Sequence, residues 1–217
     1  MPYILATEQK LKECCWMPDW ALALPHFQLE ALYKIIEDQP GNIIVDVGCF
    51  VGGFSKVMGQ LAKERNGKVY SIDLFKGALE PVVNWGCHQS DDVKALFKRN
   101  MEERGLLDVF EVIEGDSVLA SEKFEDNSVD VVFLDASHNY QSVKKDIEAW
   151  FPKIKSGGII CGHDYEYTTF NEEYVNEDGH GDRHHGVIKA VNEFFNNKDL
   201  QFNKGNYFTC IWSHKKI

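Results

Sequence analysis

Short runs of consecutive apolar residues alternate along the chain with longer segments in which apolar positions recur every three or four residues. A short continuous apolar run is typical of a strand buried on both faces of a parallel sheet, and the longer spacing is typical of an amphipathic helix. The alternation predicts βαβ crossovers and therefore an α/β fold with a doubly wound, mostly parallel sheet. The predicted strands are Ile43–Val47, Lys68–Asp73, Phe110–Glu114, Val129–Leu134 and Gly158–Cys161. The predicted helices are Phe27–Ile36, Gly53–Glu64, Asp91–Arg104, Ser117–Lys123 and Tyr140–Phe151.

The pattern changes after the fifth predicted strand. The segment Tyr165–Arg183 is acidic, aromatic and punctuated by glycine without a regular period, which favours a loop or lid. A helix is predicted at Gly186–Asn197. Two β-type runs then follow, Leu200–Phe202 and Tyr207–Trp212, on either side of a turn at Asn203–Asn206. They predict a terminal hairpin, so that one of its strands lies antiparallel to the other strands of the sheet.

Length and charge narrow the function classes. The chain has 217 residues, which suits one domain, and we interpret residues 1–40 as an N-terminal helical extension and 165–185 as a lid-like loop. The 23 Lys and Arg residues against 34 Asp and Glu residues give a formal net charge of −11. Because such a surplus repels phosphate backbones and no basic stripe offsets it, we expect no nucleic-acid partner.

No segment of the sequence predicts a membrane or secretory location. The longest apolar runs are far shorter than the ~18 residues that span a bilayer, and the N-terminus shows no signal-peptide pattern. The cysteines form no C-x-x-C pair, and a disulfide framework is unusual in a chain of this length, so we expect free thiols and a cytoplasmic protein. The six cysteines are Cys14, Cys15, Cys49, Cys87, Cys161 and Cys210.

A glycine-rich turn follows the first predicted strand. In a doubly wound sheet, ligands bind beyond the carboxyl ends of the strands, where the chain leaves the sheet. Gly48 permits a tight turn, and Gly52 and Gly53 let backbone approach a ligand closely. Asp46 and Ser55 flank this turn, and we include both in a predicted cofactor-binding site.

Acidic residues at the ends of the next two strands extend this prediction. Asp73 ends the second strand, where a carboxylate can accept from both hydroxyls of a ribose. Asp116 and Ser117 follow the third strand, where an acceptor would suit the exocyclic amine of adenine. The alternative for these carboxylates is helix N-capping. Their placement at adjacent strand ends favours a bound adenosine.

The turn departs from the dinucleotide fingerprint G-x-G-x-x-G, because Phe50 stands where the second glycine would be. In that fingerprint, the second glycine lets the backbone approach the pyrophosphate of the dinucleotide closely. Its absence argues against NAD and for an adenosine ligand without phosphate.

Together these motifs resemble class I S-adenosylmethionine-dependent methyltransferases over residues 40–213. Within that class the sequence is similar to the macrocin O-methyltransferase and cephalosporin-biosynthesis type, and more distantly to catechol O-methyltransferase. The resemblance implies S-adenosylmethionine as cofactor and a seven-stranded sheet with its last strand antiparallel. The matching segments are Asp46–Ser55, Asp73, Gly115–Ser117, Phe133–Tyr140, Lys155–Gly158 and Gly162–Tyr165.

Residues that can bind a metal ion follow the fourth and fifth strands. Asp135, His163 and Asp164 are expected at one edge of the sheet, and histidine and carboxylate ligands suit a divalent ion, with Mg²⁺ favoured by oxygen ligands. The resemblance to catechol O-methyltransferase implies a metal held by an acid after strand four and an acid–amide pair after strand five. This chain has a histidine–aspartate pair there instead. The alternative for Asp135 is to cap the next helix or to bind the amino group of the cofactor.

His138 is the predicted catalytic base. It follows Asp135 by three residues, and a histidine with a pKa near 7 can remove a hydroxyl proton while the methyl group is transferred. A nearby cation would lower the pKa of the substrate hydroxyl. The alternative is a histidine that binds the cofactor or a loop carbonyl.

Two further segments carry weaker signals. The residues His180, Asp182, Arg183, His184 and His185 crowd one segment, but their spacing is not that of metal ligands, and a substrate lid is the favoured interpretation. The segment Phe75–Ser90, which includes Trp85 and His88, could shape an acceptor pocket.

The sequence thus predicts an S-adenosylmethionine-dependent O-methyltransferase, assisted by Mg²⁺ or another divalent ion, that acts on a hydroxyl of a small molecule and that could form a homo-oligomer. One alternative is a catalytically silent protein that binds an adenosyl ligand and acts as a partner protein. Another is an NAD-dependent short-chain dehydrogenase, because the spacing of Tyr140 and Lys144 matches its catalytic pair.

Overall fold

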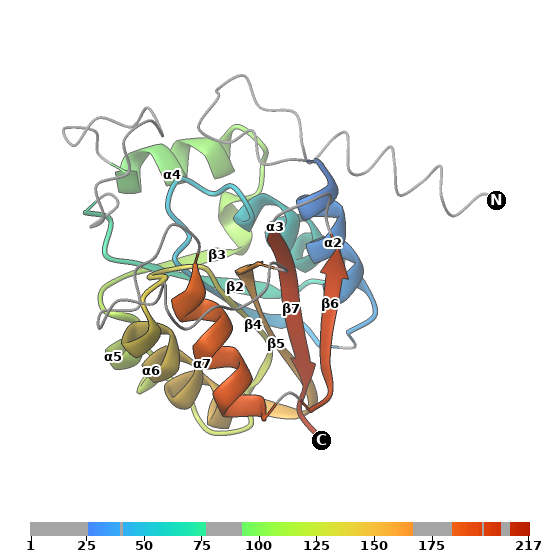
Figure 1. Cartoon of the computed structure of the whole chain (residues 1–217). Coiled ribbons are helices and arrows are strands. Elements are labelled where there is room, and N and C mark those ends of the chain that lie inside the picture. Colours follow the sequence, from blue (N-terminus) through green and yellow to red (C-terminus); the bar gives the residue numbers. More distant parts are fainter. Residues whose placement is uncertain (1–25, 40, 77–92, 167–183, 197, 205–208) are drawn as a thin grey trace.

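A single mixed sheet organises the computed structural model, which describes residues 26–39, 41–76, 93–166, 184–196, 198–204 and 209–217. Its strand order is β3-β2-β1-β4-β5-β7-β6 (Figure 1). Strands β1 to β5 run parallel, and β7 is antiparallel to both of its neighbours, β5 and β6. The predicted doubly wound sheet with a terminal antiparallel hairpin is therefore confirmed. The strands are β1 (Ile43–Val47), β2 (Lys68–Asp73), β3 (Phe110–Glu114), β4 (Val129–Leu134), β5 (Ile154–Glu166), β6 (Leu200–Lys204) and β7 (Thr209–Lys215).

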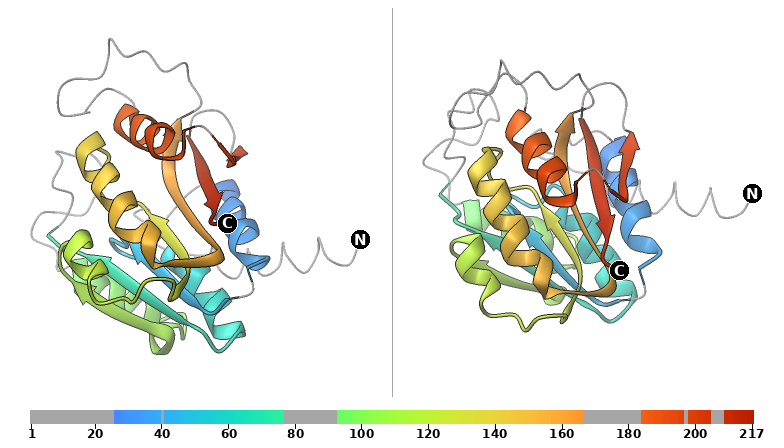
Figure 2. Two further views of the ribbon diagram at one scale, coloured as in Figure 1. Left: turned by 90° about the horizontal axis from the view of Figure 1, so that it is seen from below. Right: turned by 60° about the horizontal axis from the view of Figure 1, so that its bottom comes forward.

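Helices cover both faces of the sheet, as crossovers of one hand require (Figures 1 and 2). On one face lie α2 (His26–Glu37), α3 (Ser55–Glu64) and α4 (Val93–Glu102). On the other face lie α5 (Ser117–Ser121), α6 (Tyr140–Trp150) and α7 (His185–Phe195). Short 3₁₀ turns at Leu107–Val109 and Phe151–Lys153 lead into β3 and β5. No helix in the described ranges is long and apolar enough to cross a membrane.

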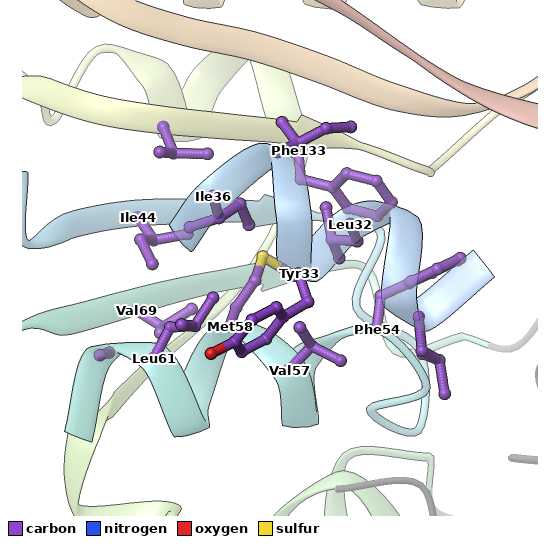
Figure 3. Close-up of a cluster of buried hydrophobic side chains, with 14 of the residues drawn as sticks. Leu32, Tyr33, Ile36, Ile44, Phe54, Val57, Met58, Leu61, Val69 and Phe133 are labelled. Atoms are coloured by element: carbon purple, nitrogen blue, oxygen red, sulfur yellow. The ribbon is translucent and has the colours of Figure 1, made fainter. Parts of the chain in front are cut away.

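Two cores sandwich the sheet because successive side chains of a strand point to opposite faces. Ile44 and Phe133 contribute to the core under α2 and α3, whereas Val45 and Leu134 contribute to the core under α6 and α7. Figure 3 shows the first core, in which side chains of α2 and α3 meet those of the central strands. Every residue of β4 is buried, which explains the continuous apolar run that predicted it.

The structure corrects several predicted boundaries after the fourth strand. β5 begins four residues earlier than predicted and continues to Glu166, so the segment predicted as a lid begins with strand residues. The strand is longer because its end pairs with β7, a partner distant in sequence. Asn203 and Lys204 belong to β6 and not to the turn. The rest of the predicted lid, residues 167–183, and the turn residues 205–208 lie outside the described residues.

Gly48 holds a tightly constrained turn between the ends of β1 and β4. Its φ is +86°, and a Cβ at this position would lie 2.2 Å from the carbonyl oxygen of Asp135. The backbone N–H of Gly48 donates to the carbonyl oxygen of Ile72 at 2.8 Å, and the backbone N–H of Asp135 donates to the carbonyl oxygen of Val47 at 2.8 Å. Only glycine therefore allows the turns after β1 and β4 to pack against each other.

We expect Gly48→Ala to destabilise the fold much more than Gly157→Ala. Gly157 has nearly the same φ, +82°, but a Cβ there meets nothing within 4 Å. Both variants incur the backbone cost of roughly 1–2 kcal/mol for this conformation, and Gly48→Ala adds about 2 kcal/mol or more for the clash. Urea denaturation of both variants measures the difference, and equal losses would show that the contact at Asp135 is unimportant.

Candidate active site

The candidate site lies at the carboxyl ends of the parallel strands, where β1 and β4 are neighbours and the strand order reverses. In open α/β sheets this switch point is where ligands bind. The glycine turn after β1, the acid that ends β2 and the segment after β4 all meet at this edge, as predicted.

Asp46 and Ser55 lie inside the protein. Both side chains are buried, and the Ser55 hydroxyl donates to Asp46 Oδ2 at 2.5 Å, while Ser71 donates to the same oxygen at 3.3 Å. Burial is the main cause that raises the pKa of Asp46 to about 7. Their side chains therefore tie β1 and β2 to the start of α3 and hold the glycine turn in place. Gly52, in that turn, has a φ of +99° and is buried, and Gly53 is half-buried.

Asp73 ends β2, where the sequence predicts the ribose of the cofactor. One carboxylate oxygen accepts from the backbone N–H of Phe50 at 2.8 Å, and the other accepts from that of Phe75 at 2.7 Å. The side chain is half-buried, and its burial raises the pKa of the carboxyl above the ordinary value. Each oxygen has a second lone pair, so Asp73 can still accept from two ligand hydroxyls.

Asp116 adopts the alternative role that the sequence left open. It is the N-cap of α5, where its side chain accepts from the backbone N–H of Leu119 at 3.0 Å. Ser117 accepts from the indole N–H of Trp150 at 2.9 Å and also hydrogen-bonds Asp146, whose pKa burial raises to about 6. Any contact of Asp116 with adenine would have to be made alongside this cap.

A bulge in β5 brings His163 and Asp164 to the same side. Consecutive strand residues normally point to opposite faces of a sheet. Here the pairing with β7 shifts register between Gly162 and Tyr165, and Asp164 has a φ of +57°. Aspartate tolerates this left-handed conformation better than most residues do. As a result, His163 Nδ1 lies 3.1 Å from Asp164 Oδ1.

Asp135 completes the metal-ligand set that the sequence predicted. Its Oδ1 lies 3.7 Å from His163 Nδ1, and the ligand atoms of Asp135, His163 and Asp164 all lie within 4.8 Å of one another. The ring of Phe54, at the end of the glycine turn, packs against the imidazole of His163 with 5.0 Å between ring centroids. The other imidazole nitrogen, Nε2, is buried and has no hydrogen-bond partner in the part of the chain that the structure describes.

His138 and His184 approach the same carboxylate from the other direction. His138 Nε2 lies 2.9 Å from Asp164 Oδ2, and His184 Nδ1 lies 3.5 Å from Asp164 Oδ1. The two imidazole rings are 4.3 Å apart. Gly186 permits this arrangement, because a Cβ there would lie 2.3 Å from the carbonyl oxygen of His138, so the start of α7 packs directly on the loop after β4.

Asp135, His138, His163, Asp164 and His184 form one cluster, in which the pKa values of His163 and Asp164 are displaced in opposite directions. Burial alone would lower the pKa of His163, but the negative charges and hydrogen bonds of Asp164 and Asp135 outweigh it and raise the pKa to about 10. Burial likewise opposes ionisation of Asp164, yet the facing histidines hold its pKa well below the ordinary value. Without a metal ion, a proton on His163 therefore compensates the buried carboxylates.

His184 is the site residue that sequence reasoning assigned elsewhere. The sequence offered one signal for it, the Gly186 that follows two residues later, but no spacing linked His184 to Asp164. Its neighbour His185 is buried. The other residues of that predicted lid cluster and of the predicted acceptor loop lie outside the described residues: His180, Asp182, Arg183, Trp85 and His88.

Two other sequence signals lead away from this site. The hydroxyl of Tyr140 donates to Glu193 on α7 at 2.5 Å, so the tyrosine of the predicted dehydrogenase pair serves a contact between two helices. The sheet order, with an antiparallel β7, also differs from the order β3-β2-β1-β4-β5-β6 of the dinucleotide-binding fold. Cys49 and Cys161 are buried free thiols, as predicted for these two.

A family model and a curated relative match parts of this chain. A family model described as a methyltransferase domain matches residues 45–165, from β1 to the bulged end of β5. An uncharacterized protein of Sinorhizobium fredii, y4gI, is 40% identical over 47 residues, which are 22% of this chain. The match spans only 5% of the length of that protein.

Solved structures share the fold. The chain is similar to an O-methyltransferase of Bacillus cereus in complex with SAH, with a TM-score of 0.61 and 18% identity over 100% of this chain and 91% of that chain. It is also similar to the O-methyltransferase TomG of Streptomyces achromogenes, involved in tomaymycin synthesis and solved with SAM. There the TM-score is 0.63 and the identity 15%, over 95% of this chain and 89% of that chain.

The raised pKa of Asp46 predicts that stability falls as pH rises. The folded protein binds the Asp46 proton up to a pKa of about 7, whereas the unfolded chain releases it near 3.8. This contribution is complete below pH 3.8 and is lost as the pH rises through about 7, and it amounts to roughly 4 kcal/mol. Asp46→Asn should therefore flatten the fall of the unfolding free energy between these pH values.

The matched control is Asp126→Asn, which removes a carboxylate that is 63% exposed. Urea denaturation at a series of pH values measures all three proteins. If the unfolding free energies of wild type and Asp46→Asn changed in parallel with pH, the raised pKa of Asp46 would be wrong.

Proposed function

Because the chain belongs to the methyltransferase-domain family, we propose that it transfers a methyl group from S-adenosylmethionine to a hydroxyl group of a small molecule, with the help of a divalent metal ion. The observation that supports this most directly is the convergence of Asp135, His163 and Asp164 beside His138, at the sheet edge that also carries the glycine turn.

The residues at the ends of β1 to β3 fit an adenosyl ligand. Asp73 keeps acceptor capacity for two ribose hydroxyls while its backbone partners hold it in place. At the end of β3 the backbone is open, since a Cβ on Gly115 would meet nothing within 4 Å. S-adenosylmethionine, when bound, supplies a methyl group on a positively charged sulfur. The bound SAM and SAH of TomG and the Bacillus cereus enzyme support the same ligand here.

The cluster at the ends of β4 and β5 fits a divalent cation. Asp135, His163 and Asp164 offer two carboxylates and an imidazole within bonding reach of one ion. The Nδ1 atom of His163 lies near both carboxylates, whereas its Nε2 atom has no hydrogen-bond partner among the described residues. A divalent ion held there would lower the pKa of an acceptor hydroxyl and orient it. The two positive charges of such an ion would balance the two carboxylates, so that His163 would not need to carry an extra proton.

We assign proton removal to His138. Its Nε2 donates to Asp164 Oδ2 at 2.9 Å, which leaves Nδ1 as the basic nitrogen of the neutral ring. In the proposed reaction, Nδ1 takes the hydroxyl proton of the acceptor, the acceptor oxygen bonds to the methyl carbon, and the bond from that carbon to sulfur breaks. Asp164 orients the ring and stabilises the positive charge that forms on it, as a carboxylate partner of a catalytic histidine does.

The acceptor is proposed to be a small hydroxylated molecule. The net charge of −11 disfavours a nucleic-acid acceptor. An aspartate, a histidine and a cation at one edge suit the ionisation of a hydroxyl group.

Cofactor binding is the first test. Calorimetric titration with the demethylated product SAH should show binding, and titration with NAD should show none. Asp73→Asn should weaken SAH binding by roughly 10- to 100-fold, because a ribose hydroxyl then loses a charged acceptor. Binding of NAD without binding of SAH would overturn the proposal.

The second test concerns proton removal. With an acceptor found by screening hydroxylated small molecules for SAH release, His138→Ala should lower kcat by ~10²–10⁴ while the affinity for SAH stays near that of wild type. Tyr140→Phe is the control, because its hydroxyl hydrogen-bonds Glu193 and Lys144 on the outer surface of the helices, and its loss should leave kcat unchanged. A loss below about tenfold in His138→Ala, with an unchanged pH–rate profile, would assign deprotonation to the metal alone.

A further inference from the structure

We propose that His138, Asp164 and His184 form a second cation site, which takes a first-row transition metal such as Zn²⁺, and that an ion held there blocks the proposed catalytic base. The site is inferred from the positions of described side chains alone. Its inhibitory effect rests on the proposed function, because it concerns the role of His138.

The possible metal ligands among the described residues form two groups of three. One group is Asp135, His163 and Asp164, to which the proposed function assigns a divalent ion. The other is His138, Asp164 and His184, whose ligand atoms also lie within 4.8 Å of one another. Neither group joins His184 to Asp135 or His163. An ion bound by His184 therefore occupies a different position from an ion bound by Asp135 and His163.

The separations in the second group suit a tetrahedral ion. His138 Nε2 lies 2.9 Å from Asp164 Oδ2, and His184 Nδ1 lies 3.5 Å from Asp164 Oδ1. Ligand atoms about 2.1 Å from a tetrahedral ion lie about 3.4 Å apart. The two imidazole rings, with 4.3 Å between their centroids, are close enough to share one ion. Three protein ligands leave the fourth position of such an ion open to water.

The fold holds the two histidines of this group together. His138 lies in the segment after β4, and His184 is the N-cap of α7. A Cβ on Gly186 would lie 2.3 Å from the carbonyl oxygen of His138 and 2.5 Å from the backbone nitrogen of Tyr140. The backbone at the start of α7 is therefore in direct contact with the segment that carries His138, and the second site needs little rearrangement of the chain.

The donor types distinguish the metals that the two groups favour. Mg²⁺ prefers oxygen ligands and keeps several waters, so it gains little from imidazole. Imidazole suits Co²⁺, Ni²⁺ and Zn²⁺ much better. The second group offers two imidazoles and one carboxylate, whereas the first offers one imidazole and two carboxylates. A transition metal is therefore favoured at the second group, and Mg²⁺ gains more from the first.

Charge allows only one of the two positions to be filled at a time. Asp135 and Asp164 carry two negative charges between them, and Asp135 Oδ1 lies 3.9 Å from His138 Nε2, so its charge acts on both positions. One divalent ion balances these charges. Two ions would leave two uncompensated positive charges around Asp164, whose side chain is only 10% exposed. The two ions are therefore expected to compete.

An ion at the second site changes which nitrogen of His138 carries the proton. The proposed base is Nδ1, while Nε2 faces Asp164. A neutral imidazole has one N–H group, so when Nε2 binds a metal its proton moves to Nδ1. The Nδ1 atom is then a donor and cannot take a hydroxyl proton from the acceptor. A transition metal at this site therefore stops the proposed transfer by occupying the base.

The first experiment measures Co²⁺ binding to the full-length protein after removal of metals with a chelator. Calorimetry gives the affinity and stoichiometry, and the visible absorption of bound Co²⁺ reports its ligands independently of catalysis. Wild type should bind one Co²⁺ per chain, and excess Mg²⁺ should weaken this binding because the two ions compete.

Variants assign the ion to one of the two groups. His184→Ala and His138→Gln should each weaken Co²⁺ binding by about 10-fold or more and change its spectrum. His163→Ala, which alters only the first group, should leave the Co²⁺ affinity within about threefold. The His184 side chain is 37% exposed, so its loss should leave thermal unfolding unchanged. His214→Gln is the control, because that histidine stacks on Phe195 at the opposite end of α7.

Two binding results would overturn the second site. One is a Co²⁺ affinity and spectrum that stay unchanged in His184→Ala. The other is an equal loss of Co²⁺ affinity in His163→Ala, which would place the ion at the first group. Binding of two Co²⁺ ions per chain would overturn the competition between the positions.

The second experiment measures methyl transfer in excess Mg²⁺ with increasing Zn²⁺. Zn²⁺ should inhibit wild type, and His184→Ala should need at least about 10-fold more Zn²⁺ for half-inhibition. Equal inhibition of both proteins would overturn the block of His138. Failure of the proposed function would look different. If Co²⁺ binds as expected and no hydroxylated acceptor is methylated at any metal concentration, the second site stands and the proposed function is wrong.

Discussion

The bulge in β5 is the constraint on which the rest of the site depends. A regular strand would send the side chains of His163 and Asp164 to opposite faces of the sheet, one into each core. Instead, the register shift against β7 and the left-handed conformation of Asp164 direct both toward the segment after β4. Asp164 then contacts His138, His163 and His184, so the pairing of β5 with the antiparallel strand β7 decides which side chains come together at this edge.

A second coupling joins this cluster to the glycine turn. The backbone of Gly48 packs against the backbone of Asp135 so closely that no side chain fits between them. Phe54, at the end of the same turn, packs on the imidazole of His163. The part of the site proposed to bind the adenosyl ligand and the part proposed to bind a cation are therefore in direct contact. Holding two reactants in a fixed relative position lowers the barrier of a direct transfer between them.

The buried acids divide into two kinds by what surrounds them. Asp46 and Asp146 accept hydrogen bonds from serine hydroxyls, and burial raises the pKa of each toward neutrality. Asp164 is as deeply buried but faces histidines, and its pKa is lowered instead. Asp46 and Asp146 connect neighbouring elements through hydrogen bonds, but their ionisation at higher pH lowers the free energy of unfolding. The second kind keeps a negative charge ready inside the protein, which is what a cation site requires.

The sequence by itself determined the architecture and most of the chemistry at the sheet edge. Four strands, β1 to β4, have the predicted bounds because buried parallel strands are continuous apolar runs, and a run of residues is a local signal. The ends of adjacent strands follow from topology, which is why Asp73, Asp135, His163 and Asp164 were predicted at one edge. Only the tertiary structure decided what each side chain contacts. In the folded chain, Asp46 accepts hydrogen bonds from hydroxyl groups of α3 and β2, and Asp116 caps the N-terminus of α5. His184 lies beside Asp164. These outcomes depend on the pairing of β5 with β7 and on the packing of α7 through Gly186, contacts between residues far apart in sequence that no local pattern encodes.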